Sequence, residues 1–242
     1  MVGDVHGCLD ELDELLRTSE YRRGVDRLVF LGDLLDRGPD PIGVLRRARE
    51  LEADVVLGNH EEKHLRYAMH EARRREDRAY RNPMRPFDPR RAAEHAALAP
   101  DDLAWIAALP RSLSLGGGWT AVHAGFVPNV PVSRQPPDWM IRLRYVDAEG
   151  KPVSRERGES GEPGVRRWAE AWNGPQSVVY GHHAQALSGP RLDMPARGVR
   201  CVGLDTGCVY GGFLTALLLP SEELVQIPSR TRSPATPPEP DE

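Results

Sequence analysis

The sequence has few cysteines, no long apolar run and no excess of basic charge. Its cysteines, Cys8, Cys201 and Cys208, are too few and too irregularly spaced for a disulfide framework, which favours a reducing compartment. The longest apolar stretch, Phe213 to Pro220, is strand-sized and too short to span a bilayer. The first residues also lack the basic and apolar regions of a signal peptide. We therefore expect a cytoplasmic protein with no membrane partner.

The charge and composition limit the possible ligands and the domain organisation. A net charge of -4 provides no overall basic field, so we expect no stable nucleic-acid binding, and an anionic ligand has to be held locally. A chain of 242 residues, 40% of them hydrophobic, is long enough to bury a sizeable core. We predict one domain over residues 1–228, with irregular cover segments at about 76–98 and 131–164. A Pro-rich disordered tail is predicted over 229–242.

Helical and strand-like patterns alternate through the first third of the chain, and strands dominate the last third. Apolar residues at helical spacing predict helices. The first of these helices begins just after Gly7, the next two run over 41–51 and 61–75, and the fourth ends at Pro110. Short apolar runs predict strands at 27–31, 54–57, 120–123, 177–180, 200–204 and 213–219. The last two strands are predicted to pair with each other, joined through a Gly-rich turn at 207–212.

The first strand is unusually short in this sequence. Only Met1 and Val2 precede Gly3, whereas strands typically contain about five residues. We therefore expect the natural chain to begin upstream of Met1.

Five polar clusters each follow an apolar strand directly. They are Gly3–Gly7 (GDVHG), Gly32–Gly38 (GDLLDRG), Gly58–Glu61 (GNHE), Val122–Gly125 (VHAG) and Tyr180–His183 (YGHH). Because ligands collect at the carboxyl ends of strands in open α/β sheets, we expect the five clusters to converge on one site.

The residue types in these clusters indicate a metal centre. Carboxylate, imidazole and amide oxygen without thiolate favour borderline or harder divalent ions, with manganese, iron, cobalt and zinc as the candidates. More than four candidate ligands argue for two ions. Two such ions, roughly 3.5–4 Å apart, activate a water and stabilise both the attacking and the leaving oxygen of a displacement.

The ordered set GDVHG, GDLLDRG, GNHE, VHAG and GHH resembles the calcineurin-like metallophosphoesterases of the phosphoprotein phosphatase superfamily. The segment Gly203–Gly212 (GLDTGCVYGG) resembles the symmetrical diadenosine tetraphosphatases and their tetraphosphatase-like relatives more than the eukaryotic-type protein phosphatases. The resemblance spans residues 3 to about 219. It implies an α/β fold, a sandwich of two mixed sheets flanked by helices, with two bound metal ions, manganese first among them.

The resemblance also implies residue roles. The metal ligands would be Asp4, His6, Asp33, Asn59, His123 and His182, with Asp33 bridging the two ions. Arg37 would bind a phosphate oxygen, as a planar cation can with two hydrogen bonds. His60 would protonate the leaving oxygen, with Asp36 holding its ring and favouring its charged form.

Several further residues have a functional and a structural interpretation. Arg142 and Arg144 resemble a basic element of the tetraphosphatase-like relatives and would contact substrate, or they form a solvated edge strand. Tyr210 is a further candidate substrate contact. Asp205 either forms a turn or braces a ligand imidazole, and His183 has a supporting or a substrate-facing role. By contrast, we expect the small side chains of Cys8 and Cys208 to pack in the protein interior. We expect His64, His70 and His95 to be exposed to solvent.

Three functions compete. The leading hypothesis is a two-metal phosphoesterase that hydrolyses phosphoanhydrides, such as diadenosine tetraphosphate or related polyphosphates. The first alternative is a protein serine/threonine phosphatase with the same machinery, so the partner is a phosphorylated small molecule or a phosphoprotein. The second is a non-catalytic binding module. The intact Asp36, Arg37 and His60 argue against it, because metal binding alone does not need them.

Overall fold

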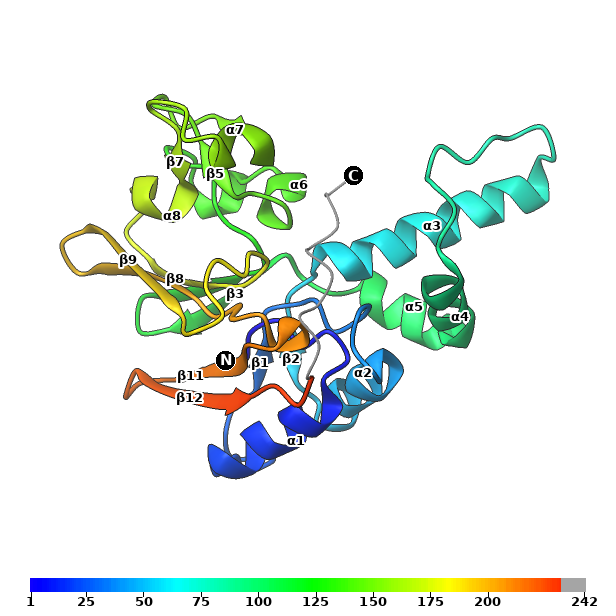
Figure 1. Cartoon of the computed structure of the whole chain (residues 1–242), viewed down its shortest axis with the longest axis horizontal. Helices are drawn as coiled ribbons and strands as arrows, with labels where there is room; N and C mark the ends of the chain where they lie inside the picture. Colours follow the sequence, from blue (N-terminus) through cyan, green and yellow to red (C-terminus); the bar gives the residue numbers. More distant parts are fainter. Residues whose placement is uncertain (232–242) are drawn as a thin grey trace.

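Two mixed β-sheets form the centre of the protein in the computed structural model, which describes residues 1–231 (Figure 1). The first sheet contains the parallel strands β1 (Val29–Phe30) and β2 (Asp54–Val55) and the antiparallel strands β11 (Phe213–Leu218) and β12 (Glu223–Pro228). The second has the order β3-β4-β8-β10-β9, with β4, β8 and β10 parallel. Its strands are Ser112–Gly116, Trp119–Val122, Ser177–Tyr180, Arg191–Ala196 and Val199–Gly203 for β3, β4, β8, β9 and β10.

Helices cover the outer faces of both sheets. On the first sheet these are α1 (Leu9–Thr18), α2 (Pro41–Glu50) and the start of α3 (Asn59–Glu76), while α4 (Pro89–Ala97) packs beside α2 and α5 (Pro100–Ala107) beside α3. The second sheet carries η1 (Val132–Arg134), α6 (Pro137–Met140), α7 (Arg155–Glu159) and α8 (Trp168–Ala171). A small antiparallel sheet lies beside them, with β5 (Tyr145–Val146) between β6 (Pro152–Val153) and β7 (Arg166–Arg167). Within the described range no helix has the length and apolar character that crossing a membrane requires.

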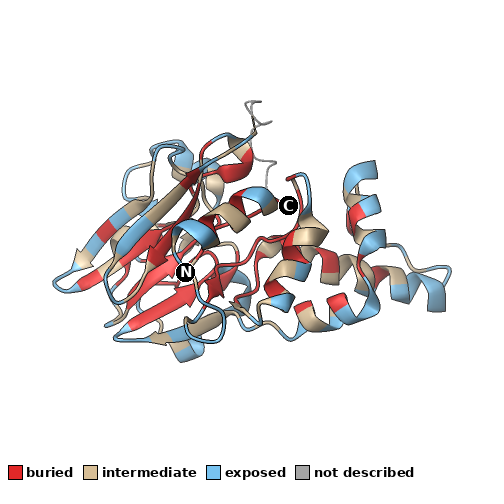
Figure 2. Ribbon diagram, turned by 90° about the horizontal axis from the view of Figure 1, so that it is seen from below, coloured by how far each residue is buried: buried red, intermediate tan, exposed pale blue. Residues whose placement is uncertain are grey.

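The core has three parts, which explain the layered arrangement. One apolar cluster lies between the sheets and includes Val29, Leu217, Ala121 and Val179. The other two pack the helices onto the outer faces, and Trp168 is fully buried in one of them. Figure 2 shows the buried residues gathered in the central strands, with exposed residues on the outer faces of the helices. The predicted sandwich of two mixed sheets flanked by helices is confirmed.

The structure corrects three expectations about secondary structure. The cover segment at 76–98 is not wholly irregular, because α4 forms over Pro89–Ala97 with Asp88 as its N-cap. The segment 131–164 likewise contains five short helices and strands, η1, α6, β5, β6 and α7, rather than plain coil. The strands β10 and β11 do not pair with each other but lie in different sheets.

Burial also differs from expectation at two histidines. His64 and His70 are buried rather than solvated, and His95 is half-buried, because the segment 77–97 packs back onto α3. His70 contacts Tyr80 through Nδ1 at 2.5 Å from Oη. Cys8 and Cys208 are buried among apolar residues, as predicted. In the predicted tail, Ser229 and Arg230 hydrogen-bond to Gly212 and Glu11, and residues 232–242 lie outside the described part of the chain.

A single residue joins the two halves of the first sheet. Val2 bridges Phe30 in parallel and Ala216 in antiparallel, while Met1 exchanges two hydrogen bonds with Leu217. A groove of about 790 Å³ continues beside Met1, between the start of β1 and the end of β11, and apolar side chains including Leu28 line it. The amino group of Met1 is buried at the mouth of this groove, and burial lowers its pKa from 8.0 to about 6.

An engineered extension of two or three apolar residues before Met1 is expected to raise the melting temperature by about 3–5 °C. The added backbone would continue the ladder and fill the groove, and the charged terminus would move into solvent. Below about pH 6 the amino group is protonated in both the folded and the unfolded state, and its burial destabilises the folded state fully. This destabilisation decreases as pH rises from 6 to 8 and is then lost. The gain on extension should therefore be larger at pH 6 than at pH 8. An extension of Gly and Ser serves as control, and equal melting temperatures for all three proteins would contradict the prediction.

Candidate active site

Six predicted ligands converge where the parallel strands of both sheets end. Asp4 and His6 follow Val2, Asp33 follows β1, and Asn59 follows β2 as the first residue of α3. His123 directly follows β4, and His182 follows β8. All except Asn59 are buried. Asp33 lies at the centre, with Oδ2 3.4 Å from Nε2 of His6 and Oδ1 3.4 Å from Nε2 of His123. Its two oxygens therefore face two different groups of candidate ligands.

The orientation of two imidazoles fits metal ligation. His6 and His123 place Nδ1 at 2.8 and 2.7 Å from the carbonyl oxygens of Leu35 and Leu31. Donation of the Nδ1 proton to a carbonyl leaves a lone pair on Nε2. In His123 this lone pair lies 2.9 Å from Oδ1 of Asn59, which is also an acceptor. Two acceptors at this distance repel each other, and a cation between them removes the repulsion.

Two buried atoms support the same interpretation. Oδ1 of Asp4 and Nε2 of His182 are buried and have no hydrogen-bond partner among the described residues. Burial raises the pKa of Asp4 well above its usual range, and the nearby carboxylates of Asp205 and Asp33 raise it further. A Cβ at Gly181 would lie 2.0 Å from Oδ1 of Asp4, so only glycine at this position leaves space for the oxygen. The donor set therefore fits two divalent cations, which neutralise clustered carboxylates.

His60 and Asp36 form a hydrogen-bonded pair beside this cluster. Nδ1 of His60 lies 2.5 Å from Oδ2 of Asp36, while its Nε2 faces the cluster at 3.9 Å from Oδ2 of Asp33. Burial would raise the pKa of Asp36, but hydrogen bonds with His60 and His64 hold it well below its usual range. Burial lowers the pKa of His60, and the negative charges of Asp33 and Asp36 oppose that shift. An ionised Asp36 thus fixes the ring and favours its charged form.

The loop that carries Asp33, Asp36 and Arg37 is strained. These three residues have φ values of 51°, 65° and 68°, in the left-handed region that non-glycine residues rarely adopt. Glu61, in the first turn of α3, holds the loop by accepting hydrogen bonds from the backbone N–H groups of 33, 34 and 35 at 2.8–3.0 Å. Burial and the charge of Asp33 raise the pKa of Glu61 to about 7. Glu61 is the last residue of the GNHE cluster, and no separate role was predicted for it from the sequence.

Helix α4 holds the loop from the other side. Nε of Arg91 donates to Oδ1 of Asp36 at 2.9 Å, and Glu94 accepts the backbone N–H of Asp36 at 2.8 Å. Nε2 of His64 lies 3.4 Å from the same Oδ1. Sequence reasoning missed these three residues. His64 stands four residues after His60, on the same helix face, and that spacing was an available signal.

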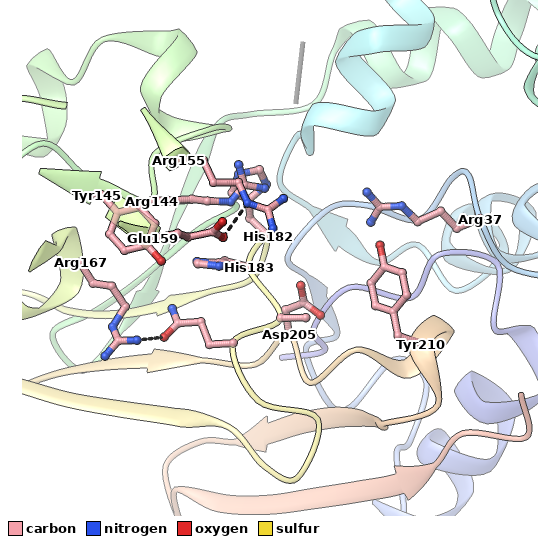
Figure 3. A pocket seen from close by; sticks show the side chains of 12 residues that line it. Arg37, Arg144, Tyr145, Arg155, Glu159, Arg167, His182, His183, Asp205 and Tyr210 are labelled. Atoms are coloured by element: carbon pink, nitrogen blue, oxygen red, sulfur yellow. Dashed lines mark hydrogen bonds and ion pairs between the residues drawn. The ribbon is translucent and has the colours of Figure 1, made fainter. Parts of the chain in front are cut away.

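A cavity of about 400 Å³ opens beside the cluster (Figure 3). Arg37 and Tyr210 lie on one side and Arg144 on the opposite side, with His182, His183 and Asp205 between them. Arg37 donates to Nε2 of His6 at 2.8 Å, and its guanidinium lies 5.4 Å from the ring centre of Tyr210.

The remaining candidates take different positions. Burial, together with Arg155 and Arg37, lowers the pKa of Arg144 to about 10. Arg142 does not line the cavity but forms an ion pair with Glu62 of α3. Asp205 accepts a hydrogen bond from the backbone of Gly207 at 3.0 Å, which is the turn interaction. His183 turns away from the ligand cluster, toward the ring of Tyr145.

Comparison with known proteins gives consistent matches. Residues 1–186 match the family described as calcineurin-like phosphoesterase. The chain is 32% identical to the asymmetrical bis(5'-nucleosyl)-tetraphosphatase of Halalkalibacterium halodurans, over 95% of this chain and 93% of that enzyme. It is 29% identical to the symmetrical bis(5'-nucleosyl)-tetraphosphatase of Coxiella burnetii, over 96% and 91%. A crystal structure provisionally identified as a diadenosine tetraphosphatase aligns with a TM-score of 0.75 at 30% identity, over 94% of this chain and 91% of that one.

Proposed function

The chain belongs to the calcineurin-like phosphoesterases, and from that membership we propose that it hydrolyses a phosphoanhydride in a dinucleoside polyphosphate such as diadenosine tetraphosphate. As a member of this family it is a metal-dependent hydrolase, and the predicted resemblance is confirmed. The observation that carries the proposal is the cavity, in which four arginines stand beside the candidate ligands. One phosphoryl group needs few cations, whereas a chain of phosphates needs several. The tetraphosphatases to which the chain is similar support the same substrate class.

The family implies two divalent metal ions, and we propose how this chain would hold them. Asp4, His6 and Asp33 would bind the first ion. Asp33 would also bind the second, with Asn59, His123 and His182. Manganese is the proposed metal, on the oxygen and nitrogen donor set. When bound, the ions supply an activated water and neutralise charge on the reacting phosphate.

The other residues have proposed roles that follow from their contacts. An ion at His6 would take the lone pair to which Arg37 donates, and the guanidinium would then be available to a phosphate oxygen in the cavity that it lines. His60 would hold a proton on Nε2 for the leaving oxygen, and Asp36 would orient the ring. The three buried cysteines have no disulfide, and with their small number we retain the cytoplasm as the proposed location.

A substrate panel tests the proposed function. With Mn²⁺ present, we expect a higher kcat/KM for diadenosine tetraphosphate than for inorganic polyphosphate, an aryl phosphate or a phosphopeptide. The reason is that only the first two substrates engage the additional arginines, and only the first carries nucleosides. Product chromatography reports the cleavage mode. The Gly203–Gly212 resemblance favours symmetrical cleavage, which yields ADP alone, whereas AMP plus ATP would assign the asymmetrical mode.

Faster hydrolysis of the phosphopeptide than of any phosphoanhydride would overturn the proposal. That outcome would assign the chain to the protein serine/threonine phosphatases, which share the dinuclear machinery. Retained metal binding without hydrolysis of any of the four substrates would instead support a binding module.

A further inference from the structure

The wall of the cavity that lies across from Arg37 has a charge pattern that the metal chemistry does not explain. It is formed by α7 and by the small sheet of β5, β6 and β7, and it contributes Arg155, Glu159, Arg167 and Tyr145 (Figure 3). None of these residues belongs to the five motif clusters. All lie in the segment from β5 to β7, which approaches the site from outside the central sandwich.

Both arginines are held by a neighbour, so that each guanidinium has a defined position. Nε of Arg155 donates to Oε1 of Glu159 at 2.6 Å. Nη1 of Arg167 donates to Oε1 of Gln185 at 2.6 Å, and its Nε and Nη2 bond Glu170 at 3.1 and 3.0 Å. Their side chains are 28% and 27% exposed, so the positions are only partly screened by water. Arg155 donates through Nε to Glu159, and its Nη groups can donate to phosphate oxygens. Arg167 uses all three of its nitrogens, but each Nη carries a second N–H that can donate to a phosphate oxygen.

The charges in the cavity are not balanced. Four guanidinium groups line it, from 37, 144, 155 and 167, against the two lining carboxylates of Glu159 and Asp205, and outside the lining Glu170 pairs with Arg167. Clustered like charges of this kind are destabilising unless an anion occupies the space between them.

We propose that Arg155 and Arg167 form a subsite for the phosphates beyond the one that is attacked, so that they select substrates by the length of the phosphate chain. This rests on the proposed function, because it concerns the same cavity. A phosphate chain held at Arg37, beside the candidate ligands, extends across the cavity toward the opposite wall, where these two arginines contact it. Glu159 competes with the chain for Arg155 and thereby limits its affinity.

Substitutions of Arg155 and Glu159 distinguish a phosphate subsite from a purely structural ion pair. In a subsite, Arg155→Ala weakens polyphosphate binding and Glu159→Gln strengthens it, because the competing charge is gone. In a structural pair, both substitutions lower the melting temperature, and neither changes affinity selectively. The matched controls are Arg157→Ala and Glu162→Gln. Arg157, in the middle of α7, and Glu162, three residues after its end, form a similar ion pair with 2.8 Å between Nε and Oε2, and neither lines the cavity.

The experiment measures two quantities on the metal-loaded enzyme. One is KM for diadenosine tetraphosphate and for an aryl phosphate. The other is the inhibition constant of inorganic tripolyphosphate against aryl phosphate hydrolysis, which does not require that any anhydride be cleaved. We expect Arg155→Ala and Arg167→Ala each to raise KM for the tetraphosphate and the inhibition constant about 10-fold, as charge-assisted hydrogen bonds do. KM for the aryl phosphate should change less than about 2-fold. Glu159→Gln should lower the inhibition constant, and Arg155→Lys should restore part of the affinity.

The outcomes distinguish the subsite from the proposed function. Unchanged inhibition constants in folded Arg155→Ala and Arg167→Ala would overturn the subsite, as would equal increases for tripolyphosphate and aryl phosphate. If the wild type cleaves no anhydride but the inhibition constants shift as expected, the subsite stands and the proposed substrate falls. Should an alanine variant fail to fold, Glu159→Gln and Arg155→Lys decide, because a raised or unchanged inhibition constant in Glu159→Gln contradicts the subsite.

Discussion

Removal of divalent metal is expected to abolish hydrolysis of every substrate, and added Mn²⁺ is expected to restore it. The described residues place five metal-type donors around Asp33, which is itself the sixth. In the proposed mechanism the reaction depends on a water that bound ions would activate at neutral pH. The measurement is the rate after exhaustive treatment with a chelator, followed by titration with Mn²⁺, Fe²⁺, Co²⁺ and Zn²⁺ and elemental analysis of the protein.

The metal experiment has an internal control in the ligands themselves. His123→Ala should lose bound metal and activity together, because Nε2 of His123 faces both Asp33 and Asn59. Exposed Arg46, on α2, provides a control position where substitution to alanine should change neither. Full activity in protein shown by elemental analysis to contain no metal would exclude the proposed mechanism.

Substitution of His60 by alanine is expected to lower kcat by about 10²- to 10⁴-fold on substrates with basic leaving groups, while both metals are retained. His60 is bonded to Asp36 through Nδ1 and does not occupy a ligand position in the proposed centre. The effect should shrink as the leaving group becomes more acidic, because such a group departs without a proton. The measurement compares kcat for a series of aryl phosphates with the metal content of each variant.

Asp36→Asn should follow the same dependence on the leaving group with a smaller loss. The asparagine keeps a hydrogen bond to His60 but no longer favours its charged form. Equal losses across the aryl phosphate series would remove His60 from the role of proton donor. A loss of metal in His60→Ala would identify it as a ligand instead.

The parts of the fold that sequence predicts are those with a local cause. Helix α2 has Pro41 at its first position and Asp40 as its cap, and β8 is an apolar run that ends at a glycine, so both appear where expected. Strand β9 was missed because its exposed residues are apolar, with Leu192 and Met194 57% and 69% exposed, and because Pro195 interrupts the pattern. An edge strand tolerates both features, and edge position is decided by tertiary structure.

The same distinction holds at the site. The candidate ligands were predictable because each lies in a short glycine-containing cluster that directly follows an apolar strand. Arg91 and Glu94 were not, because they stand 55 and 58 residues after Asp36 and act only once α4 packs against α3. That packing also buries His64, which a charged helix sequence had suggested would be solvated. Arg155 and Arg167 were missed for a related reason, since nothing near them in sequence indicates that their short sheet faces the cavity.

The attachment of Val2 between β1 and β11 sets an order of events during biosynthesis. The N–H of Gly3, directly before Asp4, donates to Thr215 at 3.0 Å, and Met1 pairs with Leu217. The segment around Val2 can therefore be fixed only after β11, about 200 residues further along the chain, has been synthesised. A nascent chain that ends before β11 lacks this support for Asp4 and His6, so we expect metal loading to follow the synthesis of β11. Contacts this distant in sequence also form slowly, which leaves the early segments exposed to chaperones in the meantime.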